Sequence, residues 1–331
     1  MEREDLARLS SQTLRALELP VLPPGAFLSS GKVRDVVTIG AEMLITTTDR
    51  ISAFDRVLAT VPCKGEVLNT LTLFWFERTA DIVPNHLLER VSARTVRAAR
   101  CEVVPVEVVV RGYLTGSALR DYQEGRPVSG IRLPPGMRPN QRFEEPLLTP
   151  STKEAGGLHD RPVSRDELLA GGLVPRGSWE EIERTAFALF RRGSEVAAAN
   201  GLILVDTKYE FGLRNGRLTL VDEVHTPDSS RYWHADTYPQ LFAAGERQRE
   251  LDKEYLRQWL LARGFRGDGE PPAIPDEVLL EVAWRYITAW QTITGSAFSP
   301  GSLDSAGESA LVLELARRTA GASGAPGAFR A

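Results

Sequence analysis

The sequence predicts a two-domain protein of mixed strands and helices. Its 331 residues exceed the length of a typical single domain. Hydrophobic residues make up 42% and charged residues 25%, as in ordinary globular proteins. Runs typical of strands lie at residues 26–48 and 88–113, and helical spacing recurs at 69–80, 178–200, 252–263 and 276–294. We therefore expect two folded units that share a cleft, with a boundary near residues 101–104.

Composition argues against several classes of protein. The net charge of −4 and pI near 5.8 argue against non-specific nucleic-acid binding. Cys63 and Cys101 have neither metal-ligand spacing nor the pattern of a disulfide framework, as in a reducing compartment. Residues 1–20 lack a signal-peptide core, and the apolar stretch 103–110 is too short to cross a bilayer. We expect a cytoplasmic protein with neither nucleic-acid nor membrane partners.

The first candidate site is a basic turn before the strand at 36–39. Gly31 lets the backbone approach a ligand closely, and Lys32 and Arg34 project to the same side of an extended chain. This arrangement fits a flap over nucleotide phosphates. Taken alone, a surface turn with two basic residues is the simpler interpretation.

A second candidate lies where a strand gives way to a helix. Arg111 ends the strand, and Thr115-Gly116-Ser117 precedes the helix at 117–124. Free backbone N–H groups, the Ser117 hydroxyl and the Arg111 guanidinium would converge at the positive end of the helix, which predicts a phosphate site. The alternative is a plain N-cap by Thr115 or Ser117.

Residues 130–177 are rich in proline and glycine and show little periodicity. Lys153 and the pair His159-Asp160 lie within this segment, which is interpreted either as a substrate lid or as a solvated loop. Ser164 and Ser178 each begin a capping-box pattern and predict the starts of helices.

The stretch from Leu202 to Trp233 carries the most chemistry. After an apolar run, Asp206, Lys208 and Glu210 alternate and would line one face of a strand. Carboxylates on one face repel each other, and Mg²⁺ bridging nucleotide phosphates would relieve that repulsion. The alternative is a solvated hairpin face with an ordinary lysine–carboxylate pair.

The register of this hairpin decides where Asp222 lies. A two-residue Asn215-Gly216 loop pairs Tyr209 with Asp222. A three-residue loop pairs Lys208 with Asp222 instead. We choose the second register, because it places Asp222 diagonal to both Asp206 and Glu210.

Two stretches follow the hairpin. His225 lies beside Asp228 and Arg231, although for a lone histidine a structural role is the commoner one. The tail 305–331 could form one helix near 308–318 and then becomes rich in glycine, alanine and proline. We expect this tail to be disordered and dispensable.

Seven stretches occur in the order and spacing of one family. They are GKVRD, TDRISAFD, PVEVVVRGYLTGSA, TPSTKEAGGLHD, LILVDTKYEFGL, VDEVHTPDSSRYW and DKEYLRQWL. Together they resemble phosphoribosylaminoimidazole-succinocarboxamide synthase (SAICAR synthetase) over residues 26–296. In GKVRD the second basic residue is Arg34, where some members carry lysine.

The resemblance implies a two-domain α+β fold related to ATP-grasp enzymes, with ATP in the interdomain cleft. With the boundary near residues 101–104, we expect a nucleotide-flap domain at 1–103, a larger domain with the metal and substrate site at 104–304 and the tail at 305–331. It implies ATP-dependent ligation of L-aspartate to the carboxylate of carboxyaminoimidazole ribonucleotide (CAIR) in purine biosynthesis, through an acyl phosphate. A monomer and a homo-oligomer both remain alternatives.

The resemblance also assigns roles to residues. The ATP contacts are Gly31, Lys32, Arg34, Glu107 and Lys208. The Mg²⁺ ligands are Glu210 and Asp222. The substrate contacts are Arg111, Thr115, Gly116, Ser117, Lys153, Asp160 and Arg231. The catalytic groups are Lys208, Lys153 and Asp228.

Two other functions compete with ligation. A small-molecule kinase could use the same flap, carboxylates and Mg²⁺ but would transfer phosphate to a hydroxyl group. A non-catalytic nucleotide-binding module would not require a second phosphate pocket beside the ATP cleft.

Overall fold

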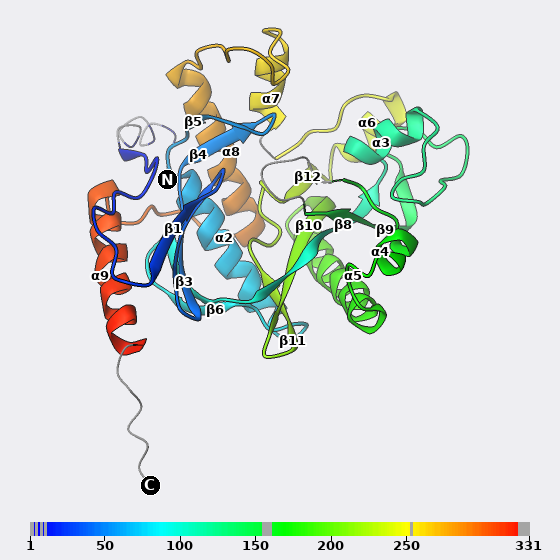
Figure 1. Ribbon diagram of the computed structural model, residues 1–331. Helices are drawn as coiled ribbons and strands as arrows, with labels where there is room; N and C mark the ends of the chain where they lie inside the picture. Colours follow the sequence, from blue (N-terminus) through cyan, green and yellow to red (C-terminus); the bar gives the residue numbers. More distant parts are fainter. Residues whose placement is uncertain are drawn as a thin grey trace.

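The computed structural model describes Arg3, Leu6, Leu9 and residues 12–153, 161–251 and 254–323. Within these ranges, strands and helices build an α+β structure with two large sheets (Figure 1). No helix in the described part of the chain is long and apolar enough to cross a membrane.

The first sheet is antiparallel and comes from the N-terminal third of the chain. Its order is β1 (Ala26–Ser30), β2 (Arg34–Ile39), β3 (Glu42–Thr47), β7 (Thr95–Ala99) and β6 (Leu87–Arg90). Alternate residues of β2 are buried, as expected for a strand with one face on a core. A separate ribbon follows β3 and consists of β4 (Arg50–Ala53) and β5 (Arg56–Thr60).

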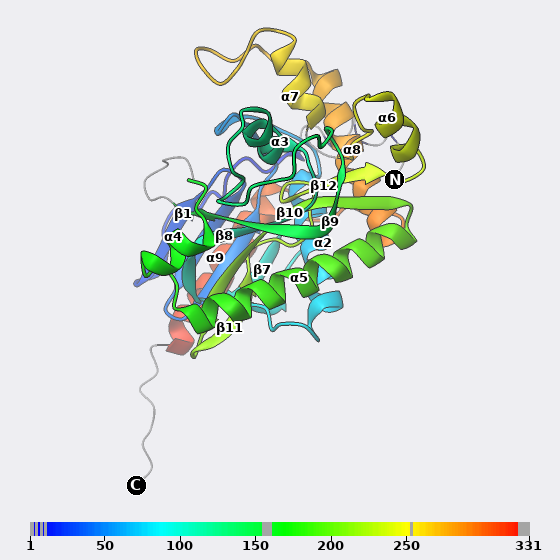
Figure 2. The ribbon, with the colours of Figure 1, turned by 90° about the vertical axis from the view of Figure 1, so that its right-hand side faces the viewer.

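The second sheet carries the polar stretches of the central sequence. Its order is β11 (Arg217–Val221), β10 (Leu202–Arg214), β8 (Glu102–Tyr113) and β9 (Arg142–Thr152), and β12 (Ser230–His234) also pairs with β10. Helix α5 (Arg176–Ala199) runs along this sheet (Figure 2).

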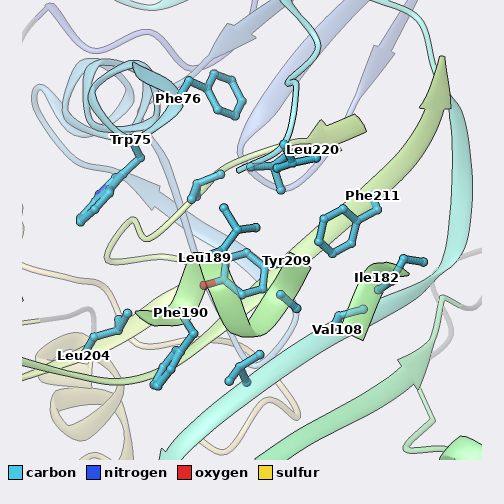
Figure 3. Packing of buried hydrophobic residues seen from close by; sticks show 14 of the residues in the cluster. Trp75, Phe76, Val108, Ile182, Leu189, Phe190, Leu204, Tyr209, Phe211 and Leu220 are labelled. Atoms are coloured by element: carbon cyan, nitrogen blue, oxygen red, sulfur yellow. The ribbon is translucent and has the colours of Figure 1, made fainter. Parts of the chain in front are cut away.

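The two faces of the second sheet differ sharply. Tyr209 and Val108 are directly opposed across β10 and β8, and both are buried in a core with Ile182 and Leu189 of α5 (Figure 3). Because side chains alternate along a strand, the neighbouring positions of β8 and β10 point to the other face. That other face holds the candidate site.

The C-terminal helices pack against elements of the N-terminal third of the chain. Helix α8 (Asp276–Thr294) runs beside α2 (Lys64–Thr79) through the middle of the molecule (Figure 1). Together with α7 (Glu254–Leu261), these helices share a core that includes Ile51 and Val61. The strands change sheets between Ala99 and Glu102. Helix α7 packs with the first unit, whereas α8 packs with both units, because Ala289 and Ile293 lie in the core beneath the second sheet.

The expectation of a disordered tail from residue 305 is wrong for Ser305–Ser323. These residues form helix α9, which packs on the first sheet through Val312 and Ala316. Glu308 is 1% exposed and accepts a hydrogen bond of 2.6 Å from Ser92 Oγ. The possible helix near residues 308–318 is confirmed and extends further at both ends, and residues 324–331 lie outside the described ranges.

The short helices are α3 (Gly116–Gln123), α4 (Arg165–Ala170) and α6 (Tyr238–Ala244). Ser164 caps α4 with the expected capping box. The second capping box is wrong, because α5 begins at Arg176, after Pro175, without a side-chain cap.

Candidate functional site

A cavity of about 880 Å³ lies between the two sheets. From the first half of the chain it is lined by the flap at residues 29–34 and by Ser52. From the second sheet and the segments that follow its strands it is lined by Lys153, Lys208, Glu210, Asp222, Glu223 and Asp228.

The flap is a tight turn whose two cations have different partners. The Gly31 amide donates a hydrogen bond of 2.7 Å to the Arg34 carbonyl. Lys32 forms an exposed ion pair with Asp55 of the β4–β5 turn. Arg34 instead reaches across the cavity, with Nη1 2.7 Å from Asp222 Oδ1 and Nη2 3.3 Å from Glu223 Oε2. Burial opposes the charge of Arg34, yet these carboxylates outweigh it and raise its pKa.

The polar face of the second sheet holds alternating charges in contact. Lys208 Nζ lies 2.7 Å from Glu107 Oε1 and 2.9 Å from Glu210 Oε1, and Lys153 also pairs with Glu210. Burial opposes both charges, but Lys208 and Lys153 lower the pKa of Glu210, while Glu210 and Glu107 raise that of Lys208. Because Glu210 is only 8% exposed and lines the cavity, this is not a solvated hairpin face.

The predicted hairpin register is wrong. Arg214 pairs with Arg217 and Glu210 with Val221, so the loop contains two residues. Asn215 (φ 52°) and Gly216 (φ 75°) both adopt left-handed conformations, as a type I′ turn requires. Lys208 therefore does not pair with Asp222.

Asp222 nevertheless reaches the cavity by another route. It follows the last residue of β11 and has φ 62°, so the chain leaves the strand at this residue. Its carboxylate bonds Arg34 and lines the same cavity as Glu210. The strand end, not the register, brings these two predicted residues together.

Asp206 does not join them. Its carboxylate lies between two arginines, 3.2 Å from Arg111 Nη1 and 2.5 Å from Arg231 Nη1. Over the ranges the structure describes, no group of three or more histidine, cysteine or carboxylate side chains is arranged to hold a metal ion. The predicted cluster of three carboxylates on one face is therefore not formed.

Arg111 and Arg231 converge with the start of α3. Arg111 and Arg231 lie on β8 and β12, on either side of Asp206 of β10. Arg111 Nη2 donates to Ser117 Oγ at 3.1 Å. Gly116 has φ 59°, and a Cβ there would clash with the guanidinium of Arg231.

The plain N-cap alternative fails for Thr115. Its side chain makes no capping hydrogen bond to α3, although it occupies the N-cap position. Burial and the nearby Arg231 lower the pKa of Arg111 against the pull of Asp206, as expected where cations are crowded together. Such a crowded pair of arginines beside a helix start is suited to an anion with several oxygens.

A second cavity, of about 260 Å³, adjoins this cationic group. It is lined by Asp206, Arg231, the loop at 227–230, the β4–β5 turn at 52–55 and Arg257. Asp228 lines both this cavity and the larger one. Most of the predicted residues therefore line two neighbouring cavities that share Asp228. Among the described residues, the predicted ones that line neither cavity are Glu107, Arg111, Thr115, Gly116 and Ser117.

Sequence reasoning missed the two side chains that hold Asp228. Lys64, at the start of α2, is fully buried, with Nζ 2.8 Å from Asp228 Oδ2. The hydroxyl of Tyr286, on α8, donates to Asp228 Oδ1. No local pattern marks either residue, apart from a lysine in an otherwise buried helix start.

The remaining candidates are two histidines and Asp160. His225 is fully buried, its Nε2 is 2.6 Å from the Tyr209 hydroxyl, and burial lowers its pKa to about 3. It belongs to the core, as the structural interpretation predicts. His159 and Asp160 lie outside the described residues.

Comparison with known proteins identifies a family. The family model for SAICAR synthetase matches residues 27–272. Phosphoribosylaminoimidazole-succinocarboxamide synthase of Bacteroides thetaiotaomicron is 47% identical over 273 residues, covering 81% of this chain and 87% of the relative. That of Legionella pneumophila (strain Paris) is also 47% identical, over 276 residues, covering 81% and 88%.

Solved structures show the same fold. SAICAR synthase of Saccharomyces cerevisiae, in complex with SAICAR, has a TM-score of 0.75 and 32% identity, covering 86% of this chain and 100% of that one. A type-2 SAICAR synthetase in complex with ADP has a TM-score of 0.63 at 23% identity, covering 83% and 100%, a likeness of fold. By sequence and by fold, the chain belongs to the SAICAR synthetase family.

Proposed function

We propose that this protein uses ATP to join L-aspartate to the carboxylate of CAIR, giving SAICAR, ADP and phosphate in purine biosynthesis. Its relatives carry the name of that synthase, and the yeast neighbour is complexed with SAICAR. The observation that carries the proposal is the pair of cavities that share Asp228, because the reaction brings a nucleotide to a second phosphorylated substrate.

ATP is assigned to the larger cavity, between the two sheets, as an ATP-grasp relationship implies. Gly31, Lys32 and Arg34 cover one side of this cavity. Lys208, held by Glu107, faces it from the second sheet. Ammonium and guanidinium groups of this kind bind phosphate oxygens through charge-assisted hydrogen bonds.

Glu210 and Asp222 fit a site for Mg²⁺. They are hard oxygen donors on one cavity, and Mg²⁺ in phosphate-transfer sites takes one or two carboxylates together with phosphate oxygens. When bound, the ion supplies neutralisation of the charge on the transferred phosphoryl group. Lys153, Lys208 and Arg34, which now hold these carboxylates, add positive charge around the same space.

The ribonucleotide is assigned to the smaller cavity. Arg111, Arg231 and Ser117 would bind its phosphate, with Thr115-Gly116 at the start of α3 beside them. Asp206 holds the two arginines together by accepting hydrogen bonds from both. Lys153, Asp160 and Asp228 are assigned to the reacting end of the substrates.

The chemistry proceeds in two steps. A carboxylate is a poor electrophile, so an oxygen of the CAIR carboxylate first takes the γ-phosphoryl group of ATP, and ADP leaves. The aspartate amine then attacks the acyl carbon, the C–O bond to phosphate breaks, and the amine loses a proton. Lys208 and Lys153 stabilise negative charge on the phosphoryl oxygens. We propose that this occurs in the cytoplasm, with CAIR and L-aspartate as small-molecule substrates and with neither nucleic-acid nor membrane partners.

A product assay tests the function. Purified protein is incubated with ATP, Mg²⁺, CAIR and L-aspartate, and SAICAR and phosphate are measured with each component omitted in turn. Equal amounts of SAICAR and phosphate, dependent on all components, are expected. Phosphorylation of CAIR without any need for aspartate would indicate a kinase, and ATP binding without turnover would indicate a non-catalytic module.

A further inference from the structure

We propose that Lys64 and Tyr286 are positioning residues that hold Asp228, oriented and ionised, at the junction of the two cavities. This inference rests on the proposed function and adds two residues to its site. Both act through Asp228 and neither lines the cavities that Asp228 lines.

The three side chains come from three distant parts of the chain. Lys64 begins α2, Asp228 lies in the loop before β12, and Tyr286 lies in the middle of α8. Lys64 and Tyr286 each bond a different oxygen of the carboxylate. Two partners on two oxygens fix both the position and the rotation of the carboxylate, which one partner alone would not do.

Because the ion pair between Lys64 and Asp228 is buried, it is a poor source of folding stability. Lys64 is 0% exposed and the Asp228 side chain is 6% exposed. A buried ion pair contributes little net stability compared with apolar residues of similar size, because both charges lose their hydration. Cys63, immediately before Lys64, has φ 61°, and strained residues of this kind cluster at functional sites.

Charge around Asp228 comes from several elements. Lys64 from α2 and Tyr286 from α8 touch it. Arg34 from β2 and Glu223 from the strand end also face it electrostatically. Lys64 and Arg34 favour the ionised carboxylate and Glu223 opposes it, so removal of Lys64 shifts the balance toward the protonated form.

The test uses pH–rate profiles of SAICAR formation. Lys64→Met keeps an apolar stem of similar length and removes the charge, and Tyr286→Phe removes only the hydroxyl. We expect kcat/KM at neutral pH to fall by about 10- to 100-fold in Lys64→Met. We also expect its acidic limb to move up by about one pH unit, because Asp228 ionises less readily. Tyr286→Phe should shift the limb in the same direction, and Lys64→Arg should restore part of the activity.

Arg94→Met is the matched control. Arg94 also forms a buried ion pair, 2.7 Å from Asp49 and 3.0 Å from Glu66, and it lies beside Gly65 at the start of α2, so it controls for a disturbed helix start. The Arg94→Met variant should have a lower Tm, and the acidic limb of its pH–rate profile should not move.

Two results would overturn the inference while leaving the proposed function intact. One is a Lys64→Met enzyme that resembles Arg94→Met, with a lower Tm and an unmoved acidic limb. The other is a Tyr286→Phe enzyme with the parent profile, which decides the matter alone if Lys64→Met does not fold. A parent enzyme that makes no SAICAR would overturn the proposed function, and this inference with it.

Discussion

At the residue scale, substitutions of Arg111 and Arg231, which both contact Asp206, test which cavity binds CAIR and which binds ATP. Arg111→Lys or Arg231→Lys should raise KM for CAIR much more than KM for ATP. A guanidinium can bind two phosphate oxygens, whereas an ammonium binds as a point charge. The lost charge-assisted hydrogen bond should cost about 1.5–3 kcal/mol, roughly a 10- to 100-fold change. Steady-state kinetics with each substrate varied in turn measures both constants.

Arg126→Lys is the control, because Arg126 pairs with Asp121 and Glu124 on an exposed surface. It should leave both constants near the parent values. If Arg111→Lys or Arg231→Lys raised only the ATP constant, the two phosphate sites would have to be exchanged.

Glu210→Gln and Asp222→Asn should each abolish most ligation while the fold stays intact. Each change removes a charged oxygen ligand and so weakens Mg²⁺ at the phosphates. Activity measured against Mg²⁺ concentration should show a higher requirement for the metal. Glu183→Gln is the control, because Glu183 is a partly buried carboxylate of α5 that pairs with Arg165 and lines neither cavity. A variant with normal turnover at ordinary Mg²⁺ concentration would remove that residue from the metal site.

Among single residues, the sequence predicts contacts between side chains that are close together along the chain. Arg111 and Ser117 are six residues apart, and their hydrogen bond follows from a strand that runs into a helix. Lys64 and Asp228 are separated by 164 positions, and no spacing rule connects them. Only the packing of α2 and α8 brings Lys64 and Tyr286 to Asp228.

At the scale of secondary structure, the register of the β10–β11 hairpin is the prediction that is wrong. Asn-Gly is the strongest signal for a two-residue turn, because both residues tolerate positive φ. A three-residue loop would gather three carboxylates on one face, but the structure has the two-residue turn. Asp222 reaches the cavity that Glu210 lines through its own left-handed conformation, which an aspartate adopts at moderate cost and which no sequence period reveals.

Helix α9 should contribute measurably to stability. Val312→Ala removes buried methyl groups from the contact with the first sheet and should lower the free energy of unfolding by about 1–2 kcal/mol. Arg317→Ala, on the exposed side of the same helix, should change it by less than about 0.5 kcal/mol. Urea unfolding compares the two, and equal stability of both variants would show that α9 does not bind the sheet in solution.

For the whole molecule, buried histidines set the response to acid. Burial lowers the pKa of His86 to about 4 and that of His225 to about 3. In the unfolded chain histidine titrates near pH 6.5. The unfolded state therefore binds protons first as the pH falls below about 6.5, and stability is lost from there downward by about 1.4 kcal/mol per pH unit for each histidine.

Urea unfolding at pH 7.5 and pH 5.0 measures this loss. His86→Phe removes one titrating ring and keeps an aromatic side chain, so its stability should fall less between the two pH values. An unchanged slope would mean that His86 accepts a proton in the folded protein.

The return of α8 to α2 also governs how the protein is made. Thr70 and Trp290 are hydrogen-bonded across 220 residues of chain, and Tyr286 lies on the same late helix. At synthesis rates of about 5–20 residues per second, α2 leaves the ribosome roughly tens of seconds before its partner exists. During that interval the apolar side of α2 lacks its partner α8. We therefore expect the nascent chain to expose an apolar surface that chaperones can bind before its substrate site is complete.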